Sequence, residues 1–171
     1  MRRRILVVCA ALVALLALAA GPAAVGGANP QLLEVQSMTG LPRAYTGSQL
    51  PVRGLDGGGL PWVVGLAKAE LSSGGFLQLR VRHLVIDPND PAAISKGLAG
   101  SNPSPTLRAV VSCLTAAGGT VNVMSDPFPA TTGVGGGSGA IETQLSLPSP
   151  CLAPILFITS PAGAWFATTG G

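Results

Sequence analysis

Few side chains in this 171-residue sequence could carry out hydrolytic chemistry, and they are scattered along the chain. A serine nucleophile needs a base beside it, and the only histidine is His83. The stretch Gly136-Gly137-Ser138-Gly139-Ala140 lacks the second glycine of a nucleophile elbow, and it precedes a predicted strand where the elbow requires a helix. We therefore predict no catalytic residue, and we expect His83 to lie partly buried at the end of a strand.

Cofactor and metal patterns are equally weak. The glycine-rich stretch holds the formal dinucleotide pattern Gly135-x-Gly137-x-x-Ala140, but it lacks the strand before and the helix after that would aim amides at a pyrophosphate. Asp87, Asn89 and Asp90 offer oxygen ligands for calcium, yet two prolines interrupt them and no bidentate glutamate follows at the required distance. Turn formation explains these residues better. One histidine and a cysteine pair cannot build a usual zinc site, so we predict no metal and no cofactor.

Two sets of side chains leave alternatives open. Trp62 and Trp165 are each flanked by small or turn residues and could form a sugar-stacking surface, although packing in the core or at its rim is the commoner fate of such rings. Asp56, Asp87 and Asp126 lie far apart in the sequence. Two carboxylates that the fold brought within about 5 to 10 Å across a cleft would favour glycoside hydrolysis.

The first 28 residues read as a secretory signal. Arg2, Arg3 and Arg4 precede an uncharged apolar run over residues 5–20, which gives way to small residues. The run is shorter than the ~20 residues that span a bilayer, so a retained membrane anchor is the less favoured alternative. We predict cleavage after Ala28, with cleavage after Gly26 as the second choice, and a protein that is secreted or held in the cell envelope.

Charge argues against two classes of partner. The leader arginines account for the whole formal net charge of +3, so the rest of the chain is balanced. No basic patch remains to bind nucleic acid or an anionic lipid surface. Charged residues make up 10% of the chain, against ~25% in an average soluble domain. We therefore expect a surface covered mainly by small polar residues.

Cys113 and Cys151 are the cysteines that remain once the leader, with Cys9, is removed. Export carries a chain to an oxidising compartment, where such a pair forms a disulfide. Closing a loop of about 39 residues stabilises a fold by roughly 4 kcal/mol in the chain-entropy model. We predict this disulfide, which would tie a strand ending near Leu114 to the start of the last hydrophobic strand. Two free buried thiols are the alternative.

Residues 29–171 have the length of a single domain. Alternating apolar residues between glycine and proline turns predict short strands near residues 33–37, 49–53, 62–64, 68–72, 77–82, 107–113, 121–125, 141–147, 155–159 and 164–168. The turn at 73–75 makes a hairpin, and a bulge is expected near His83. One helical turn is expected around 92–97. The glycine-rich loops 56–59 and 133–139 are expected to be exposed and mobile.

This spacing of strands and turns predicts an all-β fold. An antiparallel β-sandwich, immunoglobulin-like in general shape, is the first prediction, and a small β-barrel is the alternative.

Four pieces of the chain resemble a group of exported bacterial proteins of uncharacterised function. They are residues 57–64, Asn102-Pro103 with 108–113, 149–154 and 159–167. The resemblance covers nearly the whole chain after the leader. It implies an exported protein with paired cysteines, and it implies no activity, site or partner.

Two functions are compatible with these residues. The first is a non-catalytic secreted or cell-surface β-domain that binds a polymer or a protein through its surface. The alternative is an extracellular hydrolase that uses Asp and Glu side chains. The scarcity of nucleophilic and charged constellations favours binding over enzymatic activity.

Overall fold

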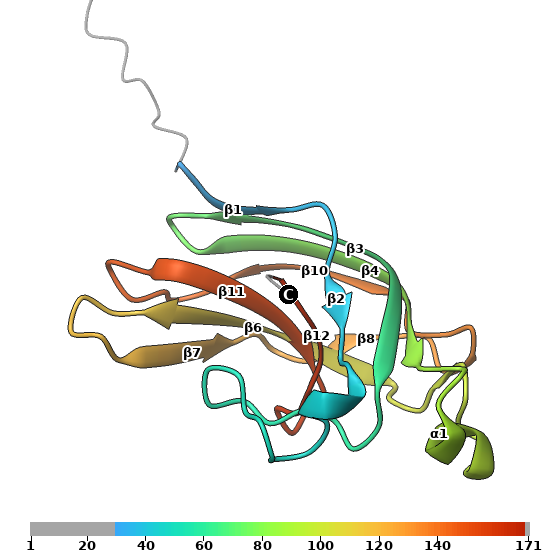
Figure 1. Cartoon of the computed structure of the whole chain (residues 1–171). Coiled ribbons are helices and arrows are strands. Elements are labelled where there is room, and N and C mark those ends of the chain that lie inside the picture. The colour runs from blue at the N-terminus through green and yellow to red at the C-terminus, as the bar shows by residue number, and fades with distance from the viewer. Residues whose placement is uncertain (1–29, 170–171) are drawn as a thin grey trace, which may run out of the picture.

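The computed structural model describes residues 30–169, so the predicted signal over residues 1–28 lies outside the described residues. The described chain is mostly strand, with one short α-helix and one 3-10 turn (Figure 1). The elements in order are β1 (Gln31–Val35), β2 (Thr39–Gly40), η1 (Arg43–Tyr45), β3 (Trp62–Ser72), β4 (Phe76–Ile86), α1 (Pro91–Ser95), β5 (Ser101–Asn102), β6 (Thr106–Leu114), β7 (Thr120–Met124), β8 (Phe128–Pro129), β9 (Gly133–Val134), β10 (Gly139–Gln144), β11 (Leu152–Thr159) and β12 (Trp165–Thr168).

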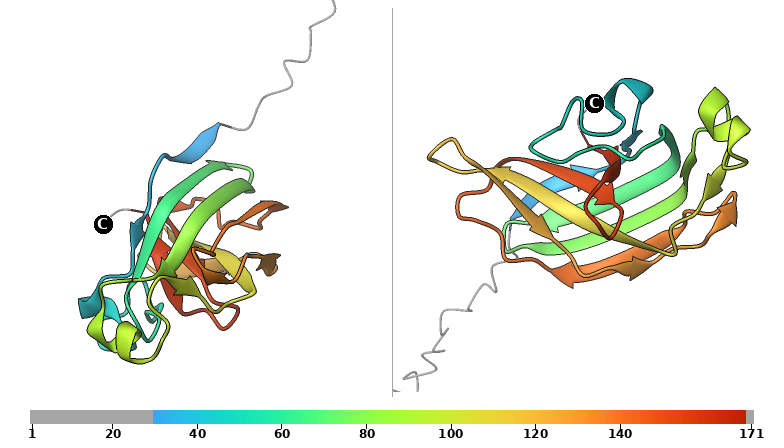
Figure 2. Two further views of the ribbon diagram at one scale, coloured as in Figure 1. Left: turned by 90° about the vertical axis from the view of Figure 1, so that its right-hand side faces the viewer. Right: turned by 90° about the horizontal axis from the view of Figure 1, so that it is seen from below.

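Two antiparallel sheets form the body of the molecule. The first, here called sheet A, has the order β1-β3-β4-β10, and the second, sheet B, has the order β2-β12-β11-β6-β7 with β8 beside β6. Strands β5 and β9 form a small separate pair. The sheets lie as two layers and do not close into a barrel (Figure 2). The predicted β-sandwich is confirmed, and the barrel alternative is wrong.

The β3–β4 hairpin is the longest pairing, and the sequence pattern predicted its second arm. Leu77, Leu79 and Val81 are buried, whereas Gln78 and Arg80 between them are exposed. This alternation follows from the pleat of a strand that packs one face on the core. It confirms the predicted half-buried strand, which continues beyond the predicted range to the end of β4.

The irregularity expected near His83 is present. Its backbone has a φ of 53°, which a bulky side chain seldom adopts, and Leu84, Val85 and Ile86 after it are all buried. The alternation is lost at this point for that reason. The expected partial burial of His83 is wrong, because its side chain is exposed.

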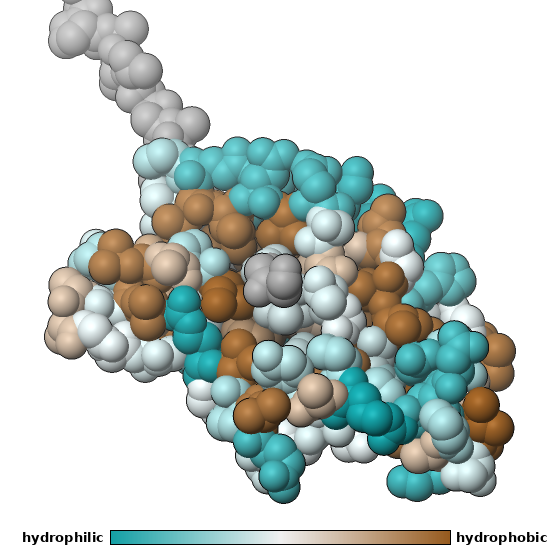
Figure 3. Space-filling model, viewed as in Figure 1, coloured by the Kyte–Doolittle hydropathy of each residue, from teal (hydrophilic) through white to brown (hydrophobic). Residues whose placement is uncertain are grey.

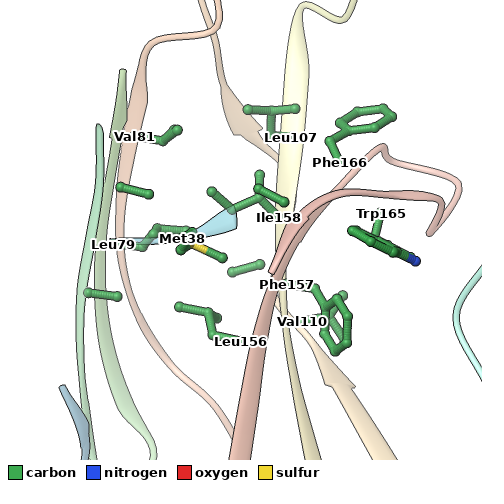
Figure 4. Close-up of a cluster of buried hydrophobic side chains, with 14 of the residues drawn as sticks. Met38, Leu79, Val81, Leu107, Val110, Leu156, Phe157, Ile158, Trp165 and Phe166 are labelled. Atoms are coloured by element: carbon green, nitrogen blue, oxygen red, sulfur yellow. The ribbon is translucent and has the colours of Figure 1, made fainter. Parts of the chain in front are cut away.

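The main core lies between the two sheets. Leu79 and Val81 of sheet A face Leu156 and Ile158 of sheet B, and Met38, from the link between β1 and β2, fills the space between them (Figure 4). All of these side chains are almost fully buried. Their burial provides the main free energy that holds the layers together.

A second apolar layer lies on the opposite face of sheet B. Val110, Phe157 and Trp165 point away from sheet A (Figure 4), and residues 41–60 cover that face (Figure 1). Within this segment, the predicted edge strand 49–53 is wrong. Val52 and Leu55 instead exchange two backbone hydrogen bonds of 3.0 Å around a tight turn, whose central residues both have positive φ.

Both predicted mobile loops are anchored by backbone hydrogen bonds. Gly137 donates to Thr131 and accepts from the N–H of Leu84. Gly58 likewise donates to the carbonyl of Trp165 at 3.0 Å. Gly57, Gly58, Gly136 and Gly137 are buried. The expected full exposure of these loops is therefore wrong, because backbone packing does not require side chains.

The predicted disulfide is present. Cys113 and Cys151 are joined, with their Cα atoms 4.9 Å apart. The bond links the end of β6 to the residue before β11, where Leu114 pairs with Leu152. It lies where the prediction placed it, at the start of the last long hydrophobic strand.

Candidate binding face

The two tryptophans do not form a sugar-stacking surface. Trp62 is 5% exposed and stacks on Phe166 with ring centroids 4.0 Å apart. Trp165 is 2% exposed and lies between Phe157 at 6.0 Å and Tyr45 at 6.2 Å. Trp165 lies on the face of sheet B that residues 41–60 cover, and Trp62, at the start of β3 in sheet A, packs against Phe166 of β12. The alternative of a binding surface at Trp62 and Trp165 is therefore wrong, and the commoner fate of such rings, packing in the core, is what the structure shows.

Asp87, Asn89 and Asp90 form a turn and a helix cap. The Asp87 side chain accepts a hydrogen bond of 2.9 Å from the Asn89 N–H. One oxygen of Asp90 accepts from the Ala93 N–H at the start of α1, and the other is ion-paired with Arg43. Within residues 30–169, no group of three or more His, Cys, Asp or Glu side chains could hold a metal ion.

The carboxylates considered for hydrolysis belong to separate parts of the fold. Asp56 lies beside β12, since its carbonyl accepts from the Trp165 N–H. Asp126 follows β7, and Asp87 follows β4. Asp87 lines a cavity of about 530 Å³ together with Asp90. Because Asp90 is already held by Arg43 and by α1, this cavity does not offer a pair of free carboxylates.

His83 and Ser138 share no hydrogen bond within the described residues. The side chain of His83 is exposed on β4, and the N–H of Ser138 donates to the Thr131 hydroxyl at 3.0 Å. The glycine pattern 135–140 runs directly into β10, not into a helix. Neither a triad nor a dinucleotide loop is assembled here.

The outer face of sheet A instead carries charged side chains in two ordered rows. The acidic row, as we call it, crosses all four strands, because Glu34 pairs with Glu70, Glu70 with Gln78, and Gln78 with Glu142.

The basic row runs parallel to the acidic row and is two residues away from it on β3 and on β4. Lys68 of β3 pairs with Arg80 of β4, which pairs in turn with Ala140 of β10. Arg82 extends the positive charge along β4 beside Leu66. Two residues along a strand span about 6.7 Å, which sets the separation of the two rows.

These side chains point outward because their neighbours point inward. On β3, Ala67, Ala69 and Leu71 are buried, and Lys68 and Glu70 between them are exposed. Strand alternation therefore forces the charged residues of all four strands onto the outer face. Hydrophilic side chains accordingly run along β1 and β3 in the space-filling view (Figure 3).

A depression of about 360 Å³ lies across this face. Its polar lining comes from both rows and the residue after β1, namely Gln36, Lys68, Glu70, Gln78, Arg80 and Glu142. The only ion pair among the described residues is Arg43–Asp90, so the two rows form no ion pairs with each other. Directly opposed like charges such as Glu34 and Glu70 destabilise a sheet. The arrangement costs folding stability. Apart from Glu34, which accepts a hydrogen bond of 2.6 Å from the Gln36 side-chain amide, it leaves the charged groups of the two rows free to bind a partner.

Sequence reasoning identified part of this face. In the strand predicted over residues 77–82, Gln78, Arg80 and Arg82 alternate with the apolar residues, which puts them on the outward side. Sequence reasoning did not find that Glu70 and Glu142 flank Gln78, because strand register cannot be read from a single chain. The alternation in residues 68–72 and 141–147 was the available signal.

Comparisons of the chain with protein-family models, with curated proteins and with solved structures find no match. In residues 30–169, no helix has the length and apolar character needed to cross a membrane.

Proposed function

We propose that the protein is an exported, non-catalytic β-domain that binds a polymer or protein partner through the outer face of sheet A. The observation that carries this proposal is the pair of oppositely charged rows around one depression. Charged groups that are not satisfied within the chain are available for ion pairs and hydrogen bonds with a partner. Complementary rows also select the orientation of what binds.

A matched pair of charge reversals tests the binding face. Lys68→Glu changes the basic row, and Lys96→Glu makes the same change beside α1, away from the face. We expect the exported protein to sediment with cell-envelope polymers from the producing cell, and Lys68→Glu to reduce the bound fraction about tenfold. Lys96→Glu should bind like the wild type. Equal retention of both variants would refute the assignment of this face.

Hydrolysis is the second candidate function, and one observation favours it. Glu70 and Glu142 lie on either side of Gln78, two strand spacings apart, which corresponds to about 10 Å. That is close to the carboxylate separation of inverting glycosidases. The face is open, however, and nothing on it excludes water. Release of reducing sugar from envelope polysaccharide, abolished by Glu70→Gln and by Glu142→Gln, would establish this activity.

A bacterial origin, which the resemblance to exported bacterial proteins implies, is part of the same proposal. So are the export of the protein and its extracellular location. The leader pattern over residues 1–28 supports them, and so does the disulfide, which is typical of oxidising compartments. N-terminal sequencing of secreted material should find a start between Val25 and Asn29. An intact form beginning at Met1 and held in the membrane would contradict the proposal.

A further inference from the structure

The outer face of sheet A is electrically balanced, and this restricts what can bind it. Its acidic groups are Glu34, Glu70 and Glu142, and its basic groups are Lys68, Arg80 and Arg82. A purely anionic or purely cationic polymer laid across the face would meet as many repulsive as attractive groups. A well-matched partner must itself carry positive and negative rows about 6.7 Å apart.

A second copy of this chain carries the same two rows at the same separation, because it has the same sequence and fold. We propose that the protein partner of this face is a second copy, packed face to face about a two-fold axis that runs between the two rows and parallel to them. This inference rests on the proposed function, because it names the partner of the same site. Symmetric self-complementary contacts of this kind are the commonest way in which soluble proteins form dimers.

The two-fold axis exchanges the rows. Rotation by 180° about this axis places each strand opposite the same strand of the second copy. It also reverses the direction in which that strand runs. The acidic row of one copy therefore lies opposite the basic row of the other. On β3, Lys68 and Glu70 belong to the two different rows, so each faces its opposite charge in the second copy. Every such contact occurs twice.

The depression supplies room for these contacts. Its volume of about 360 Å³ receives the long side chains that project from the opposing face. An axis parallel to the strands would instead place Glu34 opposite Glu142, and this arrangement is repulsive. The charge pattern therefore selects one relative orientation of the two copies as well as the partner.

Salt should control this dimer. Ion pairs at a solvent-accessible interface are screened as ionic strength rises, and the Debye length falls from ~14 Å at about 0.05 M salt to ~4 Å at about 0.5 M. We expect sedimentation velocity of the exported protein to show a dimer at the lower salt concentration and a monomer at the higher one.

Complementary charge reversals identify the interface. Lys68→Glu leaves two acidic residues on β3, and Glu70→Lys leaves two basic ones. We expect each variant alone to be monomeric, with dimerisation weakened at least tenfold, and an equimolar mixture of the two to form a heterodimer. Lys96→Glu should dimerise like the wild type. Circular dichroism of each variant verifies that these exposed substitutions leave the fold intact.

Three results would overturn the inference: a wild type that is monomeric at both salt concentrations, single variants that still dimerise, or a mixture that does not associate. A monomeric wild type whose binding to envelope polymers is still reduced by Lys68→Glu would overturn the dimer and leave the proposed function standing. A dimer that dissociates in both single variants, without any binding to envelope polymers, would support the second copy as the partner.

Discussion

Asp90 joins α1 to the segment that covers sheet B. Its side chain is 3% exposed, accepts from the Ala93 N–H at 2.9 Å and pairs with Arg43. We expect Asp90→Ala to lower the free energy of unfolding by about 2 kcal/mol, because both the helix cap and the ion pair are lost. Asp90→Asn keeps an acceptor for Ala93 and should cost about half as much.

Urea denaturation of these variants measures both effects. Asp126→Ala is the control, because this carboxylate is exposed and its side chain makes no hydrogen bond among the described residues. We expect it to change stability by less than about 0.5 kcal/mol. Equal stability of Asp90→Ala and the control would show that the helix cap and the ion pair with Arg43 contribute nothing.

Single residues also show where sequence reasoning succeeds and fails. The turn assigned to Asp87, Asn89 and Asp90 was correct because it depends on local hydrogen bonds that short polar side chains make with nearby amides. The choice between a binding surface and core packing at Trp62 and Trp165 stayed open, because burial depends on distant parts of the chain. Nothing near either tryptophan indicates that residues 41–60 fold over sheet B.

Among the elements, the loop before β10 requires glycine at one position. Gly137 has a φ of 72°, and a Cβ there would overlap the Leu84 carbonyl. Gly133 has a φ of 84° with open space around it. Both alanine variants carry the cost of a left-handed backbone, but Gly137→Ala also displaces β4. We expect it to be about 2 kcal/mol less stable than Gly133→Ala.

Thermal unfolding of the two glycine variants measures this difference. Because the backbone cost is common to both, the difference in stability isolates the clash with β4. Equal melting temperatures would mean that the loop moves aside without loss, as the sequence prediction of a mobile loop requires.

Among the strands, the alternation of apolar and polar residues predicted burial correctly only where one face of the sheet is exposed to solvent. β4 shows the pattern clearly. In β6, by contrast, Val110 and Ser112 lie on the same face as Arg108, opposite Leu107, Ala109 and Val111, yet both are fully buried. Their outer face lies under residues 41–60, so the usual inference from alternation to exposure fails there. The charged rows of sheet A escaped prediction for a related reason, since they arise from register between strands.

At the scale of the whole molecule, the Cys113–Cys151 bond joins the neighbouring strands β6 and β11 of sheet B at one end of the sandwich. Next to it, the register between β6 and β11 breaks between Leu152 and Ile155. Pro154 has no N–H to donate at this point, and Ala153 has a φ of 41°. Hydrogen bonding alone therefore holds this end of β11 weakly. The disulfide fixes the strand where the ladder cannot.

Reduction of the disulfide should therefore destabilise the whole domain. The bond spans 38 residues, and the chain-entropy model assigns it about 4 kcal/mol. For a domain of this size, that corresponds to a fall in melting temperature of roughly 10 °C. Calorimetry with and without reductant measures the fall, and a variant with both cysteines changed to alanine should melt at the lower temperature in either condition. If reductant leaves the melting temperature of the wild type unchanged, packing and the β6–β11 hydrogen bonds hold this end of β11 without the disulfide.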